Sequence, residues 1–275
     1  VQASDDDPRS MVLFGIGSTY RCFEDVEIYG NISQNYRAIN FSDVRVVNDN
    51  LQVDSNLTDE HGWTADLGFR GKVLRNSVTI DASAFIMMYN NRIGQAQRAL
   101  GNYSTKLVRT NIADARFIGL ELFEELEVFK LLKNETKWGL TWYNNIALVD
   151  ARYLKSNEKE FAGNYVENVP NLNFKSGVAL SVAGFGAGLQ LNHVAQHFTD
   201  ASNAEYYPDA TVGIIPSYTV LDFSMKYGWK RYALEASINN LTDQIYFTRR
   251  ATGYPGPGII PAERRMLFVT FEVRI

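Results

Sequence analysis

The sequence has few of the residues that bind metals or form disulfides: its 275 residues include one cysteine, Cys22, and three histidines. A single cysteine cannot form an internal disulfide, and this set of thiolates and imidazoles argues against a structural zinc site. The formal net charge of −4 lacks the basic excess typical of proteins that bind nucleic acid. No run of about 18 apolar residues occurs, so the sequence predicts no transmembrane helix. We expect neither a cofactor nor a metal.

The N-terminus also lacks the features of a natural protein start. It begins Val1-Gln-Ala-Ser-Asp-Asp-Asp, without an initiator methionine and without the apolar core of a signal peptide. We therefore expect residues 1–275 to be a piece of a longer protein. A hydrophobic content of 45% over this length excludes a disordered chain, because it is enough to bury a large apolar surface.

Apolar and polar residues alternate along much of the sequence. In Trp63–Val73 the odd positions are apolar except for one glycine, while the positions between them include Asp66 and Arg70. The last residues, Leu267 to Ile275, alternate in the same way. A period of two places the two sets on opposite faces of a β-sheet. We predict an all-β fold whose strands have one apolar and one polar face.

About eleven segments show this pattern, most of them about 10 to 15 residues long, which is longer than typical soluble strands and sufficient to cross a bilayer at a tilt. The segments are Met11–Tyr20, Val26–Ala38, Trp63–Val73, Val78–Arg92, Arg109–Phe129, Trp138–Tyr153, Asn173–Val182, Ala187–Phe198, Tyr218–Tyr227, Tyr232–Asn239 and Met266–Ile275. The connections between them alternate strictly between short and long. Outer-membrane barrels have tight turns at one rim and long loops at the other, so the pattern predicts a transmembrane antiparallel β-barrel.

An odd number of strands does not suit a complete bacterial barrel, because single-chain barrels have even strand numbers. We therefore predict an open half-barrel in which sequence neighbours pair throughout. Met11–Tyr20 and Met266–Ile275 should be its two edges. Lipid should contact an alternating apolar set, namely Trp63, Leu67, Phe69, Ile80, Ile86, Leu221, Phe223, Val269 and Phe271.

Several motifs, taken in order, resemble the TonB-dependent outer-membrane receptor family. Ile238-Asn-Asn-Leu-Thr-Asp-Gln-Ile-Tyr-Phe247 is similar to the signature of its penultimate strand. The tail that follows, Tyr254-Pro-Gly-Pro-Gly-Ile-Ile-Pro261 with Arg264-Arg265, is similar to the ferric-citrate type of receptor. Upstream, Tyr29-Gly-Asn-Ile-Ser-Gln-Asn-Tyr-Arg37, the passage from Asn50-Leu51 through Glu60 to Asp66-Leu-Gly-Phe69, and Gly119-Leu-Glu-Leu122 resemble recurrent family strands.

The resemblance implies a barrel of 22 strands with an N-terminal plug domain, of which residues 1–275 would be the C-terminal part without the plug. It implies an outer-membrane receptor of a Gram-negative bacterium that imports a ferric siderophore, ferric-citrate-like, with energy delivered by TonB through the plug. Membrane lipid and lipopolysaccharide would surround the barrel. A receptor for another nutrient, carbohydrate or cobalamin, is the alternative.

Six residues in the long loops are candidates for contact with the ligand: Arg37, Asn40, Arg249, Arg250, Arg264 and Arg265. Ferric citrate complexes are anionic, and arginine can donate two parallel hydrogen bonds to a carboxylate. The alternative is that these side chains hold loops to one another or contact lipopolysaccharide phosphates.

The sequence offers little for catalysis or metal binding. His193 and His197 are four residues apart on a predicted strand, about 13 Å along one face, which is too far to share a metal ion. A small barrel enzyme would need a histidine-based catalytic pair, and no convincing partner is present. A soluble carbohydrate-binding sandwich remains as another alternative, but it would not require long strands with all long loops at one end. We expect no enzymatic activity.

Overall fold

One curved antiparallel sheet dominates the structure, a computed structural model that describes residues 10–46, 51–100, 104–133, 136–155, 161–206, 210–251 and 257–274. Eleven strands follow one another across it, and each pairs with its neighbour in the order β1 (Gly15–Phe23), β2 (Val26–Arg37), β4 (Glu60–Val73), β5 (Val78–Leu100), β6 (Ser104–Glu127), β7 (Trp138–Tyr153), β8 (Leu172–Val182), β9 (Phe185–Val194), β12 (Tyr218–Trp229), β13 (Tyr232–Asn239) and β16 (Met266–Val273). The predicted meander is confirmed.

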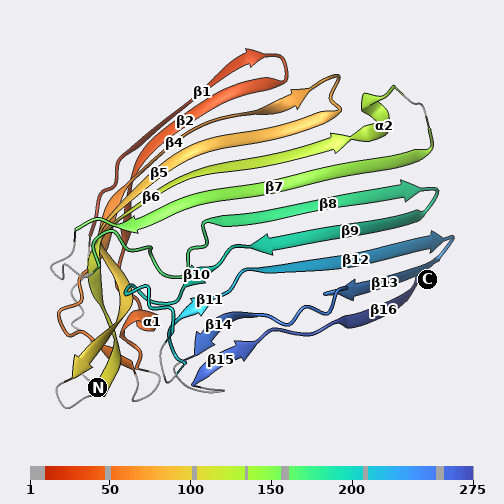
Figure 1. The fold of residues 1–275 in the computed structure, drawn as a ribbon. Coiled ribbons are helices and arrows are strands. Elements are labelled where there is room, and N and C mark those ends of the chain that lie inside the picture. Colours follow the sequence, from red (N-terminus) through yellow and green to blue (C-terminus); the bar gives the residue numbers. More distant parts are fainter. Residues whose placement is uncertain are drawn as a thin grey trace.

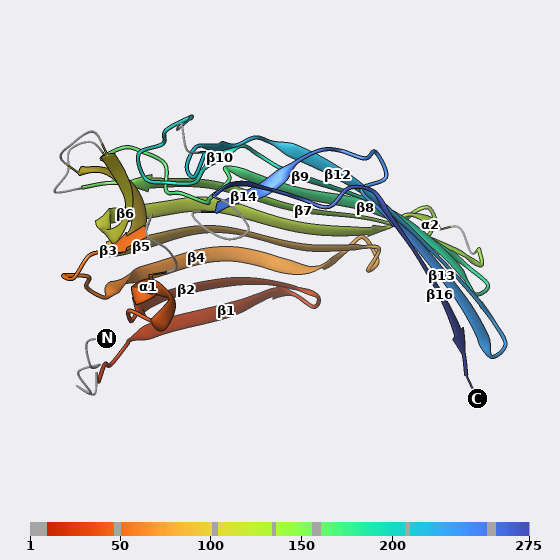
Figure 2. The same cartoon turned by 90° about the horizontal axis from the view of Figure 1, so that it is seen from below.

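The sheet does not close on itself within the described residues. β1 and β16 are the two ends of the strand order, and they lie at opposite edges of the curved sheet (Figures 1 and 2). The short turns gather at one rim, on the right in Figure 1, and the long loops gather at the other rim. The predicted half-barrel and its two edge strands are therefore confirmed, although β1 begins at Gly15 and the terminal Ile275 lies outside the described residues.

The two faces of the sheet differ as the alternation predicts. The strand registers place all nine predicted lipid-facing residues on one face, which we call the apolar face. Large side chains are strongly exposed there, among them Leu67 at 64% and Phe271 at 64%. Asp66, Arg70 and Asp222 lie on the opposite face, the polar face. Exposed apolar side chains over a whole face are expected when lipid is the surrounding solvent.

The buried core lies on the polar face, near the long loops. Phe117 and Tyr153 on that face pack with Phe161 and Val166, which come from the loop that follows β7. Farther from the loops, the ring of Tyr143 lies over Gly177, so that an added Cβ would come within 2.4 Å of the ring. The loop after β7 therefore folds over the polar face at this end of the sheet.

Short elements fill the long connections. They are α1 (Phe41–Val44), β3 (Leu51–Val53), α2 (Val128–Leu131), β10 (His197–Phe198), β11 (Ile214–Ile215), β14 (Phe247–Ala251) and β15 (Gly258–Pro261). β10 pairs with β11 and β14 pairs with β15, while β3 runs parallel to β6. Among the described residues no helix has the length and apolar character needed to span a membrane.

Several predicted strand boundaries shift by a few residues, and one predicted long loop is wrong. The sequence places a loop at Ile93–Val108, but β5 and β6 continue as a paired hairpin to Leu100 and Ser104. The pairing shifts register between Tyr89 and Arg92, and Asn91 has a positive φ of 56°. Such a bulge changes which face each later residue occupies, so the strand continues after its simple alternation has stopped.

Candidate functional site

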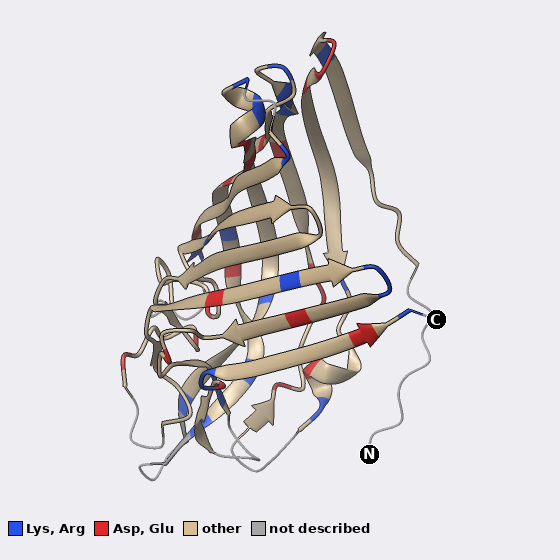
Figure 3. Cartoon of the chain, turned by 90° about the vertical axis from the view of Figure 1, so that its right-hand side faces the viewer, with Lys and Arg blue, Asp and Glu red and all other residues tan. Residues whose placement is uncertain are grey.

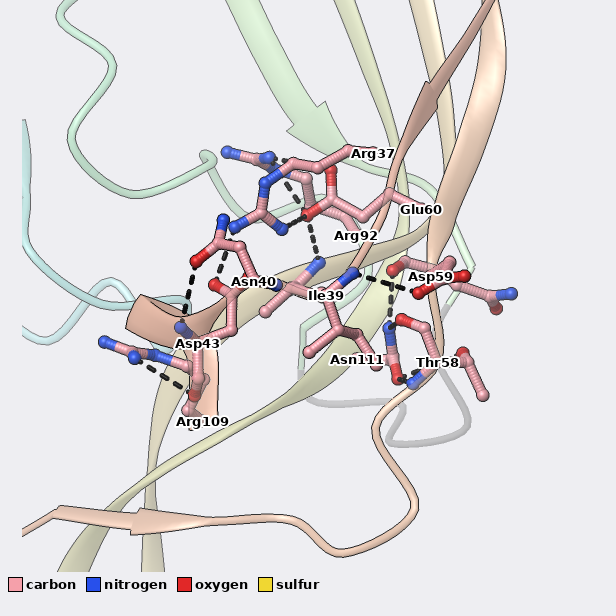
Figure 4. A network of polar contacts seen from close by, with 12 residues as sticks. Arg37, Ile39, Asn40, Asp43, Thr58, Asp59, Glu60, Arg92, Arg109 and Asn111 are labelled. Carbon is pink, nitrogen blue, oxygen red and sulfur yellow. Dashed lines mark hydrogen bonds and ion pairs between the residues drawn. The ribbon is translucent and has the colours of Figure 1, made fainter. Parts of the chain in front are cut away.

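The long-loop rim holds a network of polar contacts, and Arg37 lies within it (Figure 4). Arg37 is the last residue of β2, and its guanidinium donates to two carboxylates. Nη2 is 2.6 Å from Asp43 Oδ1, and Nη1 is 2.9 Å from Glu60 Oε1. About one third of the Arg37 side chain is exposed. Its charge is therefore largely compensated by the protein itself.

Glu60, the first residue of β4, is the centre of this network. Its side chain is fully buried and also accepts hydrogen bonds from Arg92 Nη1, at 3.2 and 3.0 Å from the two carboxylate oxygens, and from the Ile93 amide at 2.9 Å. A buried carboxylate must be paired to be tolerated. We call Arg37, Asp43, Glu60 and Arg92 the Glu60 cluster.

A second buried carboxylate adjoins this cluster. Glu167, in the loop after β7, accepts a hydrogen bond of 2.6 Å from the Tyr153 hydroxyl and one of 3.2 Å from the Gln95 amide. Burial raises the pKa of Glu167 above its ordinary value, while the hydrogen bond from Tyr153 and the charge of Arg92 act in the opposite direction. Arg92 thus interacts with both buried carboxylates, which come from two different segments of the rim.

The Asn40 side chain accepts hydrogen bonds from two backbone amides of its own loop. Its side-chain oxygen accepts from the Ser42 amide at 2.9 Å and the Asp43 amide at 3.2 Å, while Asp43 Oδ2 accepts from the Asn40 amide at 3.0 Å. This reciprocal arrangement is a capping box, which satisfies amides that a helix end leaves unpaired. Arg109 on β6 donates to the carbonyl oxygens of Ser42 and Asp43. Asn40 therefore caps α1, and Arg109 joins α1 to β6.

The loop that contains α1 is also fastened to β6 farther along its length. Leu51 is buried with Leu107 and Val212, and β3 pairs in parallel with β6. Asn111 Nδ2 donates to the Thr58 carbonyl oxygen at 2.9 Å, and the Thr58 amide donates to Asn111 Oδ1 at 2.7 Å (Figure 4). This loop is therefore packed against β6 along much of its length.

The last long loop is organised by two residues of the motif that follows Ile238. Asn240 is almost fully buried with a φ of 53°. Its side-chain Nδ2 donates to the Gln244 carbonyl oxygen at 2.9 Å, and its Oδ1 accepts from the Gln244 amide at 2.8 Å. Asp243 accepts two bonds from Arg264, at 2.8 and 2.5 Å, and one from the Arg265 amide at 3.0 Å. These bonds hold the pKa of Asp243 well below its usual range, the contact with Arg264 contributing most.

Arg249 and Arg250 lie side by side on β14, so their side chains point in opposite directions. Arg250 donates to the carbonyl oxygens of Ala210 at 3.0 Å and Ile214 at 2.9 Å, and its partial burial lowers its pKa. These bonds join the last loop to the loop before it. Arg249 is exposed, and the described part of the chain shows no hydrogen bond or ion pair from its guanidinium.

The six candidate residues thus lie in two groups at the same rim. Arg37 and Asn40 belong to the loop after β2, and the four later arginines belong to the loop after β13. Within the described residues no hydrogen bond or ion pair joins one group to the other. The Tyr254–Gly256 part of the last-loop motif lies outside the described residues.

Sequence reasoning did not select Glu60, Arg92 or Glu167 as site residues. Glu60 belongs to one of the motifs that resemble the receptor family, but a single sequence does not show that its side chain is buried. Arg92 is the last residue of a predicted strand, and Glu167 lies in a predicted long loop. Charged residues occur along the strands as well as at the turns and loops (Figure 3), so charge alone does not distinguish these three residues in the sequence.

The described residues contain no group of three His, Cys, Asp or Glu side chains placed to hold a metal ion. His193 Nδ1 lies 2.8 Å from Thr219 Oγ1, and His197 Nδ1 lies 3.1 Å from the Ala195 carbonyl oxygen. The chemistry available at the rim is therefore hydrogen bonding and charge, with guanidinium groups as its main donors.

Comparison with known proteins agrees with this architecture. The family model described as "TonB dependent receptor-like, beta-barrel" matches residues 2–241. A comparison with curated protein sequences finds no match. The fold is similar to that of the ferric citrate transporter FecA in its unliganded form, with a TM-score of 0.76 at 20% identity, over 95% of this chain and 38% of that one.

Two further structures share the fold at low identity. The ferric yersiniabactin uptake receptor FyuA from Yersinia pestis has a TM-score of 0.70 at 18% identity, over 94% of this chain and 36% of that one. The copper transporter OprC has a TM-score of 0.69 at 14% identity, over 94% and 38%. The chain thus spans well under half the length of these structures. Since the family model matches most of the chain and the sheet has the same architecture, the chain belongs to the TonB-dependent receptor family of outer-membrane proteins.

Proposed function

We propose that the chain forms the C-terminal part of the barrel of a Gram-negative outer-membrane receptor that imports a small anionic iron chelate, a ferric siderophore of the ferric-citrate type. The observation that carries the proposal is the set of long loops at one rim, which fold over the polar face and bring arginines there. Further strands would pair with β1 and β16, and a plug domain would receive energy from TonB.

Arg249 is the residue best placed for ligand contact. Its guanidinium is exposed on the β14–β15 hairpin and has no partner in the described residues, whereas the neighbouring Arg250 is used to join two loops. An unpaired guanidinium can donate two hydrogen bonds to a ligand carboxylate. Arg37 is a second candidate, because a third of its side chain remains exposed beside Glu60.

Arg264 and Arg265 would act differently. Arg264 is committed to Asp243, and Arg265 joins the same carboxylate through its amide. We assign these two residues the role of shaping the last loop, and the same holds for Asn40 in the first loop. Their replacement should alter ligand binding only by changing the loop.

The test is binding and uptake of radioactive ferric citrate by cells that make the whole receptor. Arg249→Gln should weaken binding about tenfold to a hundredfold, since one hydrogen bond to a charged group contributes about 1.5–3 kcal/mol. The effects of Arg264→Gln and Asp243→Asn should add to less than their sum in the double variant, because both break the Arg264–Asp243 contact.

Other outcomes would redirect the assignment. Binding of a carbohydrate or cobalamin in preference to ferric citrate would keep the receptor and change its ligand class. Unchanged ferric citrate binding by both Arg249→Gln and Arg37→Gln would overturn the assignment of these arginines. Hydrolase activity that vanishes in His193→Ala would replace transport by an enzymatic function.

A further inference from the structure

The apolar face has a hollow that no part of the described chain fills. It measures about 760 Å³ and spans β4, β5, β6 and β7. A site of this volume is within the ~300–1,000 Å³ range of ligand-sized sites. Its lining is almost entirely apolar and includes Ala65, Leu67, Ala84, Ile86, Leu120 and Leu148.

Small side chains produce this hollow. Ala84 on β5 lies opposite Leu67 on one side and Leu120 on the other, and Ala65 lies opposite Ile86. Two alanines beside Leu67, Ile86 and Leu120 leave a depression in this part of the apolar face. Because this face is the one with exposed apolar side chains, the depression would open toward lipid.

A row of larger residues borders the hollow on the side of the long loops. Successive strand registers place Trp63 opposite Met88, Met88 opposite Arg116, and Arg116 opposite Arg152. Tyr165 forms a bridge with Arg152 at the end of this row. Two arginines on the lipid-facing side of the sheet are unusual, because charged groups there are costly unless they lie at the interface.

The two arginines share one acidic partner, Asp150, which also lines the hollow. Asp150 Oδ1 accepts from Arg152 Nε at 2.9 Å, and Asp150 Oδ2 is 3.8 Å from Arg116 Nη2. Arg116 Nε is buried without a hydrogen-bond partner. The guanidinium of Arg152 lies 4.0 Å from the centre of the Tyr165 ring and donates to the Gly163 carbonyl oxygen at 3.0 Å. Arg116, Arg152 and Asp150 together have a formal net charge of +1, and Arg152 is held in place.

We propose that the hollow and the Arg116–Arg152 pair form a binding site for lipid A, the phosphorylated, multiply acylated glycolipid of lipopolysaccharide. An acyl chain would occupy the hollow, and a phosphate would contact the two guanidinium groups. This inference rests on the proposed placement in the outer membrane, with the long loops outside.

Geometry supports this orientation. Ile118 and Asp150 are two residues from the arginines along their strands, and Leu120 and Leu148 are four residues away, which is about 7 to 13 Å. Strand tilt shortens that distance along the membrane normal. The hollow is thus located directly beneath the arginine row, where an acyl chain descends from a phosphate held at the interface.

The experiment measures lipid binding to the whole receptor in detergent by native mass spectrometry. The probes are diphosphorylated lipid A, the same lipid without phosphates, and phosphatidylglycerol. Arg116→Gln combined with Arg152→Gln should weaken lipid A binding about tenfold, and Arg116→Lys with Arg152→Lys should retain most of it. The charge variant should bind the dephosphorylated lipid as the wild type does.

The acyl part is tested separately by Ala84→Phe, which fills the hollow and should weaken both forms of lipid A. Ala187→Phe is the matched control, because it adds the same ring on the apolar face of β9, away from the hollow. Equal lipid A affinity in the wild type and the charge variant overturns the proposal, as does preference for phosphatidylglycerol. If the receptor does not fractionate with the outer membrane, the proposed function fails instead. If lipid binding is unaffected while iron uptake continues, only this inference fails.

Discussion

Replacing Glu60 by glutamine is the most informative perturbation of the loop rim. The side chain is fully buried and accepts from Arg37, Arg92 and the Ile93 amide. Hydrogen bonds to charged groups contribute about 1.5–3 kcal/mol each, and breaking a buried ion pair costs about 3–5 kcal/mol. Water recovers part of this, because the two arginine side chains are 35% and 27% exposed. Glutamine also keeps one acceptor oxygen. We expect a loss of about 3 kcal/mol in local stability, which is about a hundredfold in the opening equilibrium.

The measurement is native-state hydrogen exchange of the Ile93 amide in the whole receptor. Glu27→Gln is the matched control, since it makes the same change in the ion pair with Arg70, whose side chain is 53% exposed. An exposed pair of this kind contributes about 0–1 kcal/mol. The reasoning is refuted if Glu60→Gln accelerates exchange at Ile93 no more than Glu27→Gln does.

Three further predictions concern a helix cap, a buried acid and a close contact. Asn40→Ala should cost about 1 kcal/mol and speed exchange of the first α1 amides, whereas Asn40→Asp should restore protection; equal exchange in both variants would contradict the cap. Because burial raises the pKa of Glu167 above 4.5, its contribution to stability is fully present below that pH and is lost as pH rises through the folded-state value. The unfolding temperature of the wild type should therefore fall more steeply between about pH 4 and about pH 8 than that of Glu167→Gln, and parallel curves would show that Glu167 does not titrate differently on unfolding. Gly177→Ala should lower stability by about 1–3 kcal/mol by displacing the ring of Tyr143; the cost should shrink in a Tyr143→Ala background, and an unchanged cost would place the strain elsewhere.

Strand positions could be predicted well from the sequence where alternation was uninterrupted. The predicted ranges Trp138–Tyr153 and Tyr232–Asn239 coincide with β7 and β13. A period of two is a local property, so it is visible without knowledge of the partner strand. The extended β5–β6 hairpin was missed because the bulge at Asn91 changes the phase of the pattern.

The rim site could be predicted only in part, because its charges were visible but their partners were not. Arg37 pairs with carboxylates six and 23 residues away, and Arg264 pairs with one 21 residues away. These pairings depend on strand register and on how two loops fold, neither of which a single sequence displays. The burial of Glu60, which organises the cluster, follows from that same packing.

The meander order has a consequence for how such a receptor can change over time. Because nearly every strand pairs only with its sequence neighbours, a hairpin with its loop can be exchanged as a cassette without disturbing distant pairs. Among the strands of the described residues, β3 departs from this order by pairing in parallel with β6. It crosses over two strands, so the loop after β2 and the β5–β6 hairpin must be inherited together. Recombination that separates them would combine a loop after β2 with a β6 strand that it does not fit. Exchange of the β8–β9 hairpin carries no such constraint.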